Sequence, residues 1–165
     1  MAGNDPTFEI FFKKELIFRD VDWKSSSELF QKISTKLEQS GYVAPTFYRA
    51  ISRREQEYPT GLQTASLGAA IPHTDPMHIK KPFIAVIRPA KPILFAQMGG
   101  DSSQKVSAAI IFILGVMRNG LQVKVLQKLM GLLSDRQKIQ DLMTAVNNMQ
   151  ILDQLKAVFT NGQQV

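Results

Sequence analysis

The chain has 165 residues, 44% of them apolar and 21% charged, which is enough to bury one sizeable core. It holds no cysteine, which excludes disulfides, thiolate metal ligands and a cysteine nucleophile, and is consistent with a cytoplasmic protein. No apolar run approaches the roughly 20 residues that span a bilayer, and the polar N-terminus has no signal-peptide pattern. The net charge of +6 comes from scattered basic residues without interleaved aromatic ones, so we expect no nucleic-acid partner.

Several short apolar segments, rich in branched and aromatic residues, predict β-strands. In chain order they are residues 8–12 and 16–18 as a strand or strand pair, then 69–71, 83–87, 93–95 and 106–116. Pro72 cannot donate to a sheet ladder, so the strand before it is expected to end there. Residues 106–116 are apolar on both alternating faces, which is typical of a central strand covered on both sides. Residues 60–69 read as a loop or an irregular strand.

Five segments carry apolar residues at helical spacing and predict helices. Their expected limits are 25–41, 45–58, 121–133, 134–143, and a last helix that begins at Asn147 or Asn148 and runs to about 160. Ser25 and Glu28 form a capping box before the first helix, and Gly41 is placed to end it. Pro45 is expected in the first turn of the second helix, and Ser134 is expected to cap the fourth.

The order of these elements favours an α/β (α+β) fold, a single domain with a central mixed β-sheet flanked by helices on both sides. Strand, two helices, several strands and then helices follow one another without a visible repeat or linker. We expect the domain to span residues 1–165, with its core at about 8–160 and a loose tail at 161–165.

His73 is the residue that points most directly to chemistry. It follows the apolar run 69–71 and Pro72, so we expect it just past a buried strand, at the mouth of the sheet. A neutral imidazole, with an ordinary pKa of about 6.5, is a nucleophile at neutral pH without a separate base. A metal site built from His73, Asp75 and His78 is the alternative, but their spacing suits a loop and no further ligand completes the set. We therefore expect no metal and no cofactor.

Several motifs in register resemble those of the IIA components of the bacterial sugar phosphotransferase system, in the mannitol/fructose structural class. They are Pro-Thr-Gly-Leu at 59–62, Gly-Ala-Ala-Ile-Pro-His at 68–73, Pro-Ile-x-Phe at 92–95 and Ile-Phe-Ile-Leu-Gly at 111–115. The run Ile-Pro-His-Thr-Asp-x-x-His-Ile at 71–79 is most similar to the galactitol branch. The resemblance covers residues 29–159.

The resemblance implies a phosphocarrier that works in the cytoplasm. Such a component accepts a phosphoryl group from the phosphohistidine of the carrier protein HPr and holds it on its own histidine. It then passes the group to a cysteine of a IIB component, which phosphorylates a sugar as the membrane IIC component admits it. His73 matches the phosphorylated residue. HPr and IIB would be transient partners and IIC an indirect one, while the sugar and the oligomeric state stay open.

The resemblance also implies residues that stabilise the phosphoryl group. Arg54 matches the arginine of the family's Arg-Glu pair, and a guanidinium holds phosphoryl oxygens in a bidentate grip. Arg53 or Arg49 is the alternative for this role. The Thr74 hydroxyl would add a further donor beside the histidine.

The second histidine of mannitol and fructose members has no direct counterpart here. Gln122 occupies the matching position at the start of a predicted helix, and His78 is the other candidate for its place. A function of a different class is also implied, because domains of this fold serve in nitrogen-related regulators and in transcriptional activators and antiterminators. In such a phospho-switch, phosphorylation of His73 would change binding to a partner without a sugar downstream. The length of a single domain favours the carrier.

Overall fold

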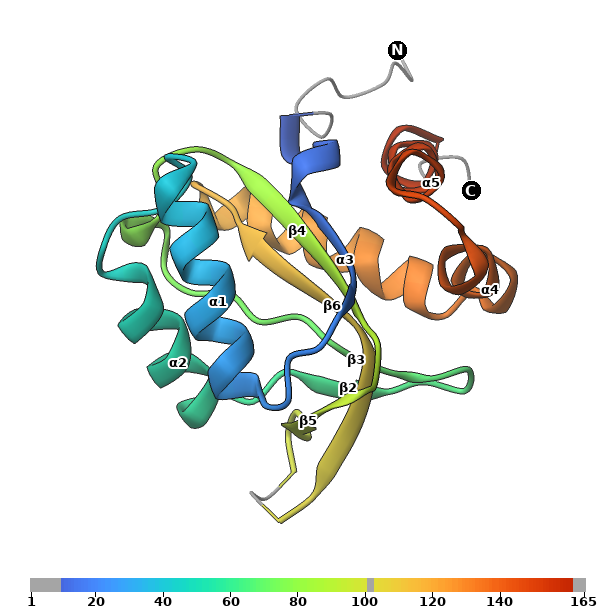
Figure 1. The fold of residues 1–165 in the computed structure, drawn as a ribbon, viewed down its shortest axis with the longest axis horizontal. Coiled ribbons are helices and arrows are strands. Elements are labelled where there is room, and N and C mark those ends of the chain that lie inside the picture. The colour runs from blue at the N-terminus through green and yellow to red at the C-terminus, as the bar shows by residue number, and fades with distance from the viewer. Residues whose placement is uncertain (1–9, 101–102, 162–165) are drawn as a thin grey trace.

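The computed structural model describes residues 10–100 and 103–161, which form a twisted β-sheet between two layers of helices (Figure 1). The strands within this part of the chain are β1 (Ile17–Val21), β2 (Gly61–Gln63), β3 (Gly68–Ala70), β4 (Phe83–Pro89), β5 (Ile93–Ala96) and β6 (Lys105–Gly115). Their order is β1-β4-β6-β3-β2, and β5 pairs with β6 off this path. The pairs β1–β4 and β3–β6 are parallel and the others antiparallel, so the prediction of a mixed sheet is confirmed.

Strand β6 lies at the centre of the sheet, and its side chains alternate between two hydrophobic cores. Phe112 and Leu114 belong to one core, while Ile111 and Ile113 belong to the other. All four side chains are fully buried. The prediction of a central strand covered on both sides is therefore confirmed. Helices lie above and below β6, so both of its faces need apolar side chains.

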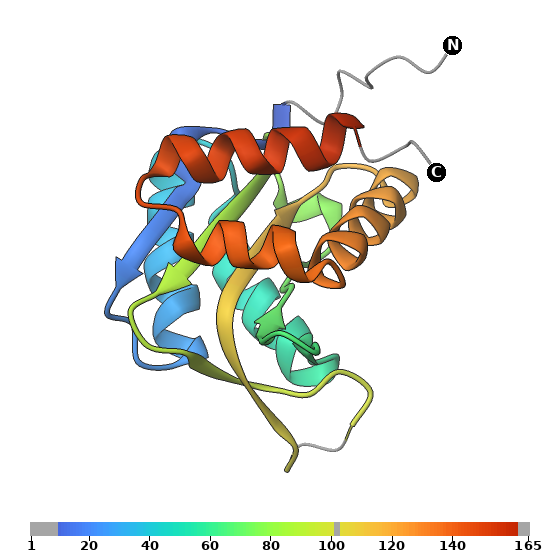
Figure 2. The ribbon, with the colours of Figure 1, turned by 90° about the vertical axis from the view of Figure 1, so that its right-hand side faces the viewer.

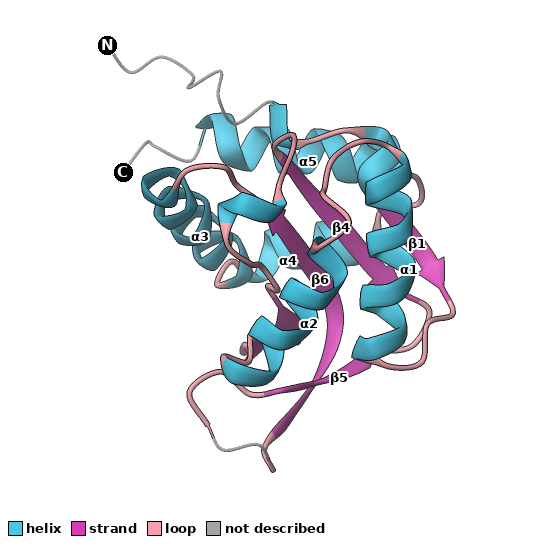
Figure 3. Cartoon of the chain, turned by 90° about the vertical axis from the view of Figure 1, so that its left-hand side faces the viewer, coloured by secondary structure: helices cyan, strands magenta, loops and turns pink. Residues whose placement is uncertain are grey.

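Helices cover both faces of the sheet. Helices α1 (Ser26–Gln39) and α2 (Phe47–Glu57) lie on one face (Figure 3), and α3 (Asn119–Leu133), α4 (Arg136–Thr144) and α5 (Asn148–Asn161) lie on the other (Figure 2). The helix pair α1 and α2 covers the core that includes Ile111 and Ile113. Among the described residues, no helix combines the length and the apolar character needed to cross a membrane.

Local capping signals set the limits of α1 as predicted. The Ser25 hydroxyl accepts a hydrogen bond from the Glu28 N–H at 3.1 Å, and the Glu28 carboxylate accepts one from the Lys24 N–H at 2.8 Å. Gly41 adopts a positive φ of 81° just after the helix, a conformation that costs side-chain-bearing residues more than glycine. The chain therefore turns sharply at this point and leads towards α2.

Two predicted capping residues are wrong by one or two positions. The Ser134 hydroxyl donates to the Met130 carbonyl oxygen at 2.8 Å and so belongs to the end of α3. Asp135 is the actual cap of α4, because its carboxylate accepts from the Lys138 N–H at 3.1 Å and its negative charge suits the positive end of the helix. Pro45 lies in the turn before α2, not in its first turn.

The first apolar run is not a strand where the structure describes it. Residues 10–12 contain a short 3-10 turn, and residues 8–9 lie outside the described part of the chain. Phe11 and Phe12 are buried in the core beneath α5, where the Phe12 and Phe159 rings lie 4.7 Å apart between centroids. The apolar character of this run thus serves packing against the end of the sheet and α5. Of the two runs, only Leu16 to Phe18 marks the strand β1.

Residues 60–69, predicted as a loop or an irregular strand, contain the antiparallel hairpin β2–β3. The Thr64 hydroxyl closes its turn by accepting from the N–H groups of Ser66 and Leu67. Gly68 is required by close packing, because a Cβ atom there would overlap the Ser107 carbonyl oxygen of β6. The hairpin brings the segment that follows β3 against the middle of the sheet.

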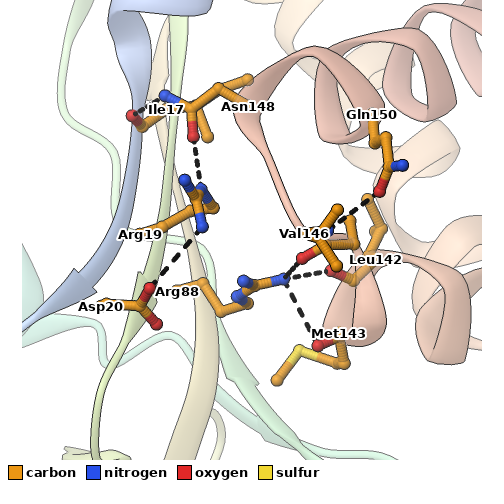
Figure 4. Close-up of polar contacts among 10 residues, drawn as sticks. Ile17, Arg19, Asp20, Arg88, Leu142, Met143, Val146, Asn148 and Gln150 are labelled. Carbon is orange, nitrogen blue, oxygen red and sulfur yellow. Dashed lines mark hydrogen bonds and ion pairs between the residues drawn. The ribbon is translucent and has the colours of Figure 1, made fainter.

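Polar contacts fix α4 and α5 to the strands beneath them (Figure 4). The Arg88 guanidinium of β4 donates to the carbonyl oxygens of Leu142 at 2.8 Å and Ala145 at 2.9 Å, at the C-terminal end of α4. Arg19 of β1 donates to the Asn148 side-chain oxygen at 2.7 Å, where α5 begins. Arg88 thus satisfies carbonyl oxygens that the end of α4 leaves without backbone partners, and Arg19 holds the first residue of α5 through its side chain.

Candidate functional site

His73 lies just past β3, where the sequence predicted it. Strand β3 ends at Ala70, and the chain continues in an extended path beside the C-terminal end of β6. The Leu114 N–H donates to the Pro72 carbonyl oxygen at 3.1 Å, and His73 forms an isolated parallel bridge with Leu114. Backbone pairing to the central strand thus holds the histidine at the mouth of the sheet.

One hydrogen bond decides which nitrogen of His73 is available for chemistry. Its Nδ1 lies 2.9 Å from the carbonyl oxygen of Ile71. A carbonyl oxygen only accepts hydrogen bonds, so Nδ1 carries the proton. In the neutral ring, Nε2 then holds the free lone pair and is the nucleophilic atom.

The surroundings favour the neutral form of His73. Burial lowers the pKa of His73 below its ordinary value of 6.5, and the positive charge of Arg54 acts in the same direction. The hydrogen bond to Ile71 and the charge of Asp75 oppose this shift without reversing it. At neutral pH, the ring is therefore uncharged and Nε2 is free to attack an electrophile.

A groove of about 730 Å³ opens between α2 and the loop that follows His73. Its polar lining includes Arg49, Arg53, Arg54, Thr74, Asp75 and His78. Thr74 and Asp75 come directly after His73, so the groove begins beside the histidine. The three arginines outnumber the acidic residues of the lining, Glu57 and Asp75, so the groove keeps a net positive charge that suits an anionic group.

Arg54 is the arginine with the closest link to His73. Its charge lowers the pKa of the His73 imidazole, and its Nη1 lies 3.5 Å from the Asp75 carboxylate. The guanidinium also stacks over the Tyr58 ring at 5.0 Å from the centroid. Arg53 instead pairs with Glu57 at 2.9 Å on an exposed part of the helix. Among Arg49, Arg53 and Arg54, it is therefore Arg54 whose charge acts on His73 and whose side chain contacts the loop after it.

Thr74 and His78 both reach the groove. Thr74 is 5% exposed, and its hydroxyl makes no hydrogen bond with another described residue, so it remains available as a donor. The Nδ1 of His78 lies 2.8 Å from the Thr46 hydroxyl at the start of α2. This contact ties the loop after His73 to α2, and His78 lines the groove.

Gln122 stands apart from the groove. It lies in the first turn of α3, and its N–H donates to the Arg118 carbonyl oxygen at 3.0 Å. Its side chain is not part of the groove lining and makes no hydrogen bond with another described residue. Among the described residues, no group of three or more His, Asp and Glu side chains is arranged to hold a metal ion.

A pair of buried polar residues was missed from the sequence. Glu55 is 9% exposed, and its carboxylate accepts hydrogen bonds from the N–H and the hydroxyl of Thr60, at 2.8 Å and 2.9 Å. Burial raises the pKa of Glu55 to about 7, against the effect of these two hydrogen bonds. The signal was its spacing, because Phe47, Ile51 and Glu55 follow one another at four-residue intervals on the buried face of α2.

Comparison with known proteins shows the family of the chain. The family model described as "Phosphoenolpyruvate-dependent sugar phosphotransferase system, EIIA 2" matches residues 10–158. The chain belongs to this family. This EIIA chain is 31% identical over 140 residues to the galactitol-specific EIIA component of the phosphotransferase system of Escherichia coli K12, covering 85% of this chain and 89% of that protein.

Solved structures of other IIA proteins share the EIIA fold seen here. The nitrogen regulatory protein IIA-Ntr from Neisseria meningitidis has a TM-score of 0.71 at 25% identity, over 93% of this chain and 99% of that one. Enzyme IIAMTL from Escherichia coli, solved in complex with phosphorylated enzyme IIBMTL, has a TM-score of 0.68 at 22% identity, over 86% and 94% of the two chains. The EIIA chain is thus a component of a phosphoryl-transfer system for sugars, and the resemblance stated from its motifs is confirmed.

Proposed function

We propose that this EIIA chain carries a phosphoryl group on Nε2 of His73, taken from the phosphohistidine of HPr and passed to a cysteine of a IIB component. The observation that carries this assignment is the hydrogen bond between Nδ1 of His73 and the Ile71 carbonyl, because it leaves Nε2 as the nucleophile. The lowered pKa of His73 supports it, since the ring is neutral at the pH of the cytoplasm, where we place the exchange.

The transfer steps balance without an added acid or base. The Nε2 lone pair forms a bond to phosphorus, the N–P bond of the donor histidine breaks, and its electron pair stays on the leaving nitrogen. His73 keeps its Nδ1 proton throughout. In the second step the thiolate of the IIB cysteine attacks phosphorus, and the pair of the Nε2–P bond returns to Nε2. Such transfers depend mainly on in-line placement and on compensation of the phosphoryl charge.

The groove supplies that compensation in the proposed mechanism. Arg54 would release Asp75 and grip the phosphoryl oxygens, since an exposed ion pair 3.5 Å long is weak. The Thr74 hydroxyl would donate a further hydrogen bond. His78 would assist from the other side of the groove, in place of the second histidine of related proteins, and Gln122 remains the alternative for that role.

Galactitol or a similar sugar alcohol is the proposed cargo, because the 31% identical relative is galactitol-specific. The proposed IIB partner agrees with the complex of IIAMTL and phosphorylated IIBMTL, and a membrane IIC component would follow it. A regulatory phospho-switch is the second candidate, favoured by the likeness to IIA-Ntr at 25% identity. The two candidate functions differ in whether a IIB component takes the phosphoryl group.

The deciding experiment supplies phosphoenolpyruvate, Enzyme I and HPr to the wild type, His73→Ala and His78→Ala, and measures the phosphoryl label on each. We expect label on the wild type and on His78→Ala, and none on His73→Ala. A galactitol-type IIB component is then added, and we expect it to take the label from the wild type. A folded wild type that accepts no label would overturn the proposal, and label that never reaches any IIB would favour the regulatory switch.

A further inference from the structure

Glu55 and Thr60 form a buried unit that the transfer steps do not use. Glu55 lies on the buried face of α2, and among the described residues no cationic side chain pairs with it. Instead both carboxylate oxygens accept from Thr60, one from its N–H and one from its hydroxyl. A buried carboxyl without a charge partner is unfavourable, so its place here calls for a reason beyond packing.

The unit continues to the nucleophile through Ile71. The Thr60 hydroxyl donates a hydrogen bond to Glu55, and its oxygen accepts one from the Ile71 N–H at 3.3 Å. The carbonyl of the same residue accepts from Nδ1 of His73 at 2.9 Å. Four residues thus form one hydrogen-bonded path, from Glu55 through Thr60 and Ile71 to the imidazole.

The direction of each hydrogen bond along this path is fixed by its ends. In its ionised form Glu55 offers two acceptors, so the Thr60 hydroxyl turns its proton towards it. If the carboxylate were absent, the hydroxyl could turn that proton to the Ile71 N–H and place two donors against each other. The hydrogen bond that fixes the Ile71 N–H would then be lost, and the Ile71 carbonyl would hold the His73 proton on Nδ1 less firmly.

We propose that Glu55 and Thr60 are positioning residues for His73, which hold the Ile71 carbonyl where it keeps the proton on Nδ1 and presents Nε2 to the phosphoryl donor. This inference rests on the proposed function, because it assigns the unit to the same phosphoryl transfer. It concerns the orientation and tautomer of the ring, not contact with the phosphoryl group. A purely structural role would stabilise the fold but leave the tautomer of His73 unchanged.

The test removes one hydroxyl and reads the tautomer directly. Thr60→Val keeps the shape of the side chain, and Thr60→Ser keeps the hydroxyl. Thr64→Val is the matched control, because its hydroxyl bonds within the turn of the same hairpin but lies outside the path to Ile71. Nitrogen NMR of the imidazole rings reports which nitrogen carries the proton, and with two histidines in the chain His78→Gln identifies the signals of His73.

We expect the wild type to hold the His73 proton on Nδ1, and Thr60→Val to show a mixture of tautomers. Its single-turnover rate of phosphoryl acceptance from phospho-HPr should fall by about tenfold, the effect of losing one hydrogen bond in the reacting geometry. Thr60→Ser should recover the wild-type tautomer and the wild-type rate, and Thr64→Val should match the wild type in both. Glu55→Gln should behave like Thr60→Val, while Glu38→Gln on the exposed face of α1 should not.

Several results would overturn the inference. It fails if wild-type His73 carries its proton on Nε2, or if a folded Thr60→Val keeps both the wild-type tautomer and the wild-type rate. If Thr60→Val does not fold, the tautomer and the rate of Glu55→Gln decide the inference instead. A wild type that shows the Nδ1 tautomer but accepts no phosphoryl group defeats the proposed function alone, since the NMR signals do not depend on transfer.

Discussion

At the scale of single residues, the ionisation of His73 links the fold to its reactivity. Burial and the Arg54 charge both favour the neutral ring, which is the nucleophilic form. The same shift contributes to stability. A base with a lowered pKa stabilises the folded state above its unfolded pKa, and this contribution is lost as pH falls through the folded pKa.

We therefore predict that His73 titrates below pH 6.5, because burial and then Arg54 lower its pKa. The measurement is an NMR titration of the ring protons of His73, with His78→Gln used to assign the two histidines. Phosphoryl acceptance should stay constant at neutral pH and fall only in the acid range of that titration. A midpoint above 6.5 would contradict the electrostatic description of the site.

Removing the Arg54 charge gives a second prediction. Arg54→Gln should raise the pKa of His73, since a positive charge near the imidazole is lost. It should also slow phosphoryl acceptance by about tenfold or more, because a charged donor to the phosphoryl oxygens is gone. Arg53→Gln is the matched control, as Arg53 is exposed and paired with Glu57. Equal effects of the two variants on the rate would remove Arg54 from its assigned role.

The position of His73 just past a strand was predicted correctly for a local reason, and the buried pair of Glu55 and Thr60 was missed for a tertiary one. A proline directly before a histidine ends a strand wherever the rest of the chain lies. The Glu55 carboxylate was visible as a charge on a buried helical stripe, but its partner lies five residues on, and the path to His73 crosses from Thr60 to Ile71. Such a path depends on the pairing of β2 with β3, which no local pattern states.

At the scale of elements, limits set by neighbouring residues were predictable, and contacts across the sheet were not. The caps of α1 at Ser25 and Gly41 depend on residues within one turn and were placed correctly. The strand expected at residues 8–12 is wrong over the described residues 10–12, where Phe11 and Phe12 pack beneath α5. Apolar character alone does not distinguish a strand from a segment that covers the end of a sheet.

The link between β4 and α4 gives a prediction at this scale. Arg88→Met should destabilise the fold by about 2 kcal/mol, because it leaves carbonyl oxygens at the end of α4 without their charged donor. Urea unfolding followed by circular dichroism measures the change, with the exposed Arg136→Met of α4 as the control. If Arg88→Met unfolds at the same urea concentration as the control, the contacts in Figure 4 contribute nothing to stability.

For the whole molecule, the mixed sheet between two helical layers followed from the order of predicted elements, since strands and helices in this order need a shared sheet. Which strands are neighbours did not follow. The path β1-β4-β6-β3-β2 places β3 beside β6, and this pairing brings His73 against Leu114. The site therefore depends on a long-range contact between β3 and β6, which the local motif around His73 does not predict.

Global stability should also carry the signature of the buried Glu55. Burial raises its pKa from 4.5 to about 7, so between these values the folded chain holds a proton that the unfolded chain has released. Stability from this group is thus fully present below pH 4.5 and is lost as pH rises to about 7, with a slope of up to about 1.4 kcal/mol per pH unit.

Glu55→Gln has no titrating group at this position, so its stability should lack that slope. We expect the unfolding free energy of the wild type, minus that of Glu55→Gln, to fall by on the order of 2 to 3 kcal/mol as pH rises from 4.5 to 7. Taking the difference removes the opposite contribution of His73, which both proteins share. A difference that stays constant over this range would mean that the carboxyl ionises normally despite its burial, with the two hydrogen bonds from Thr60 offsetting the loss of water.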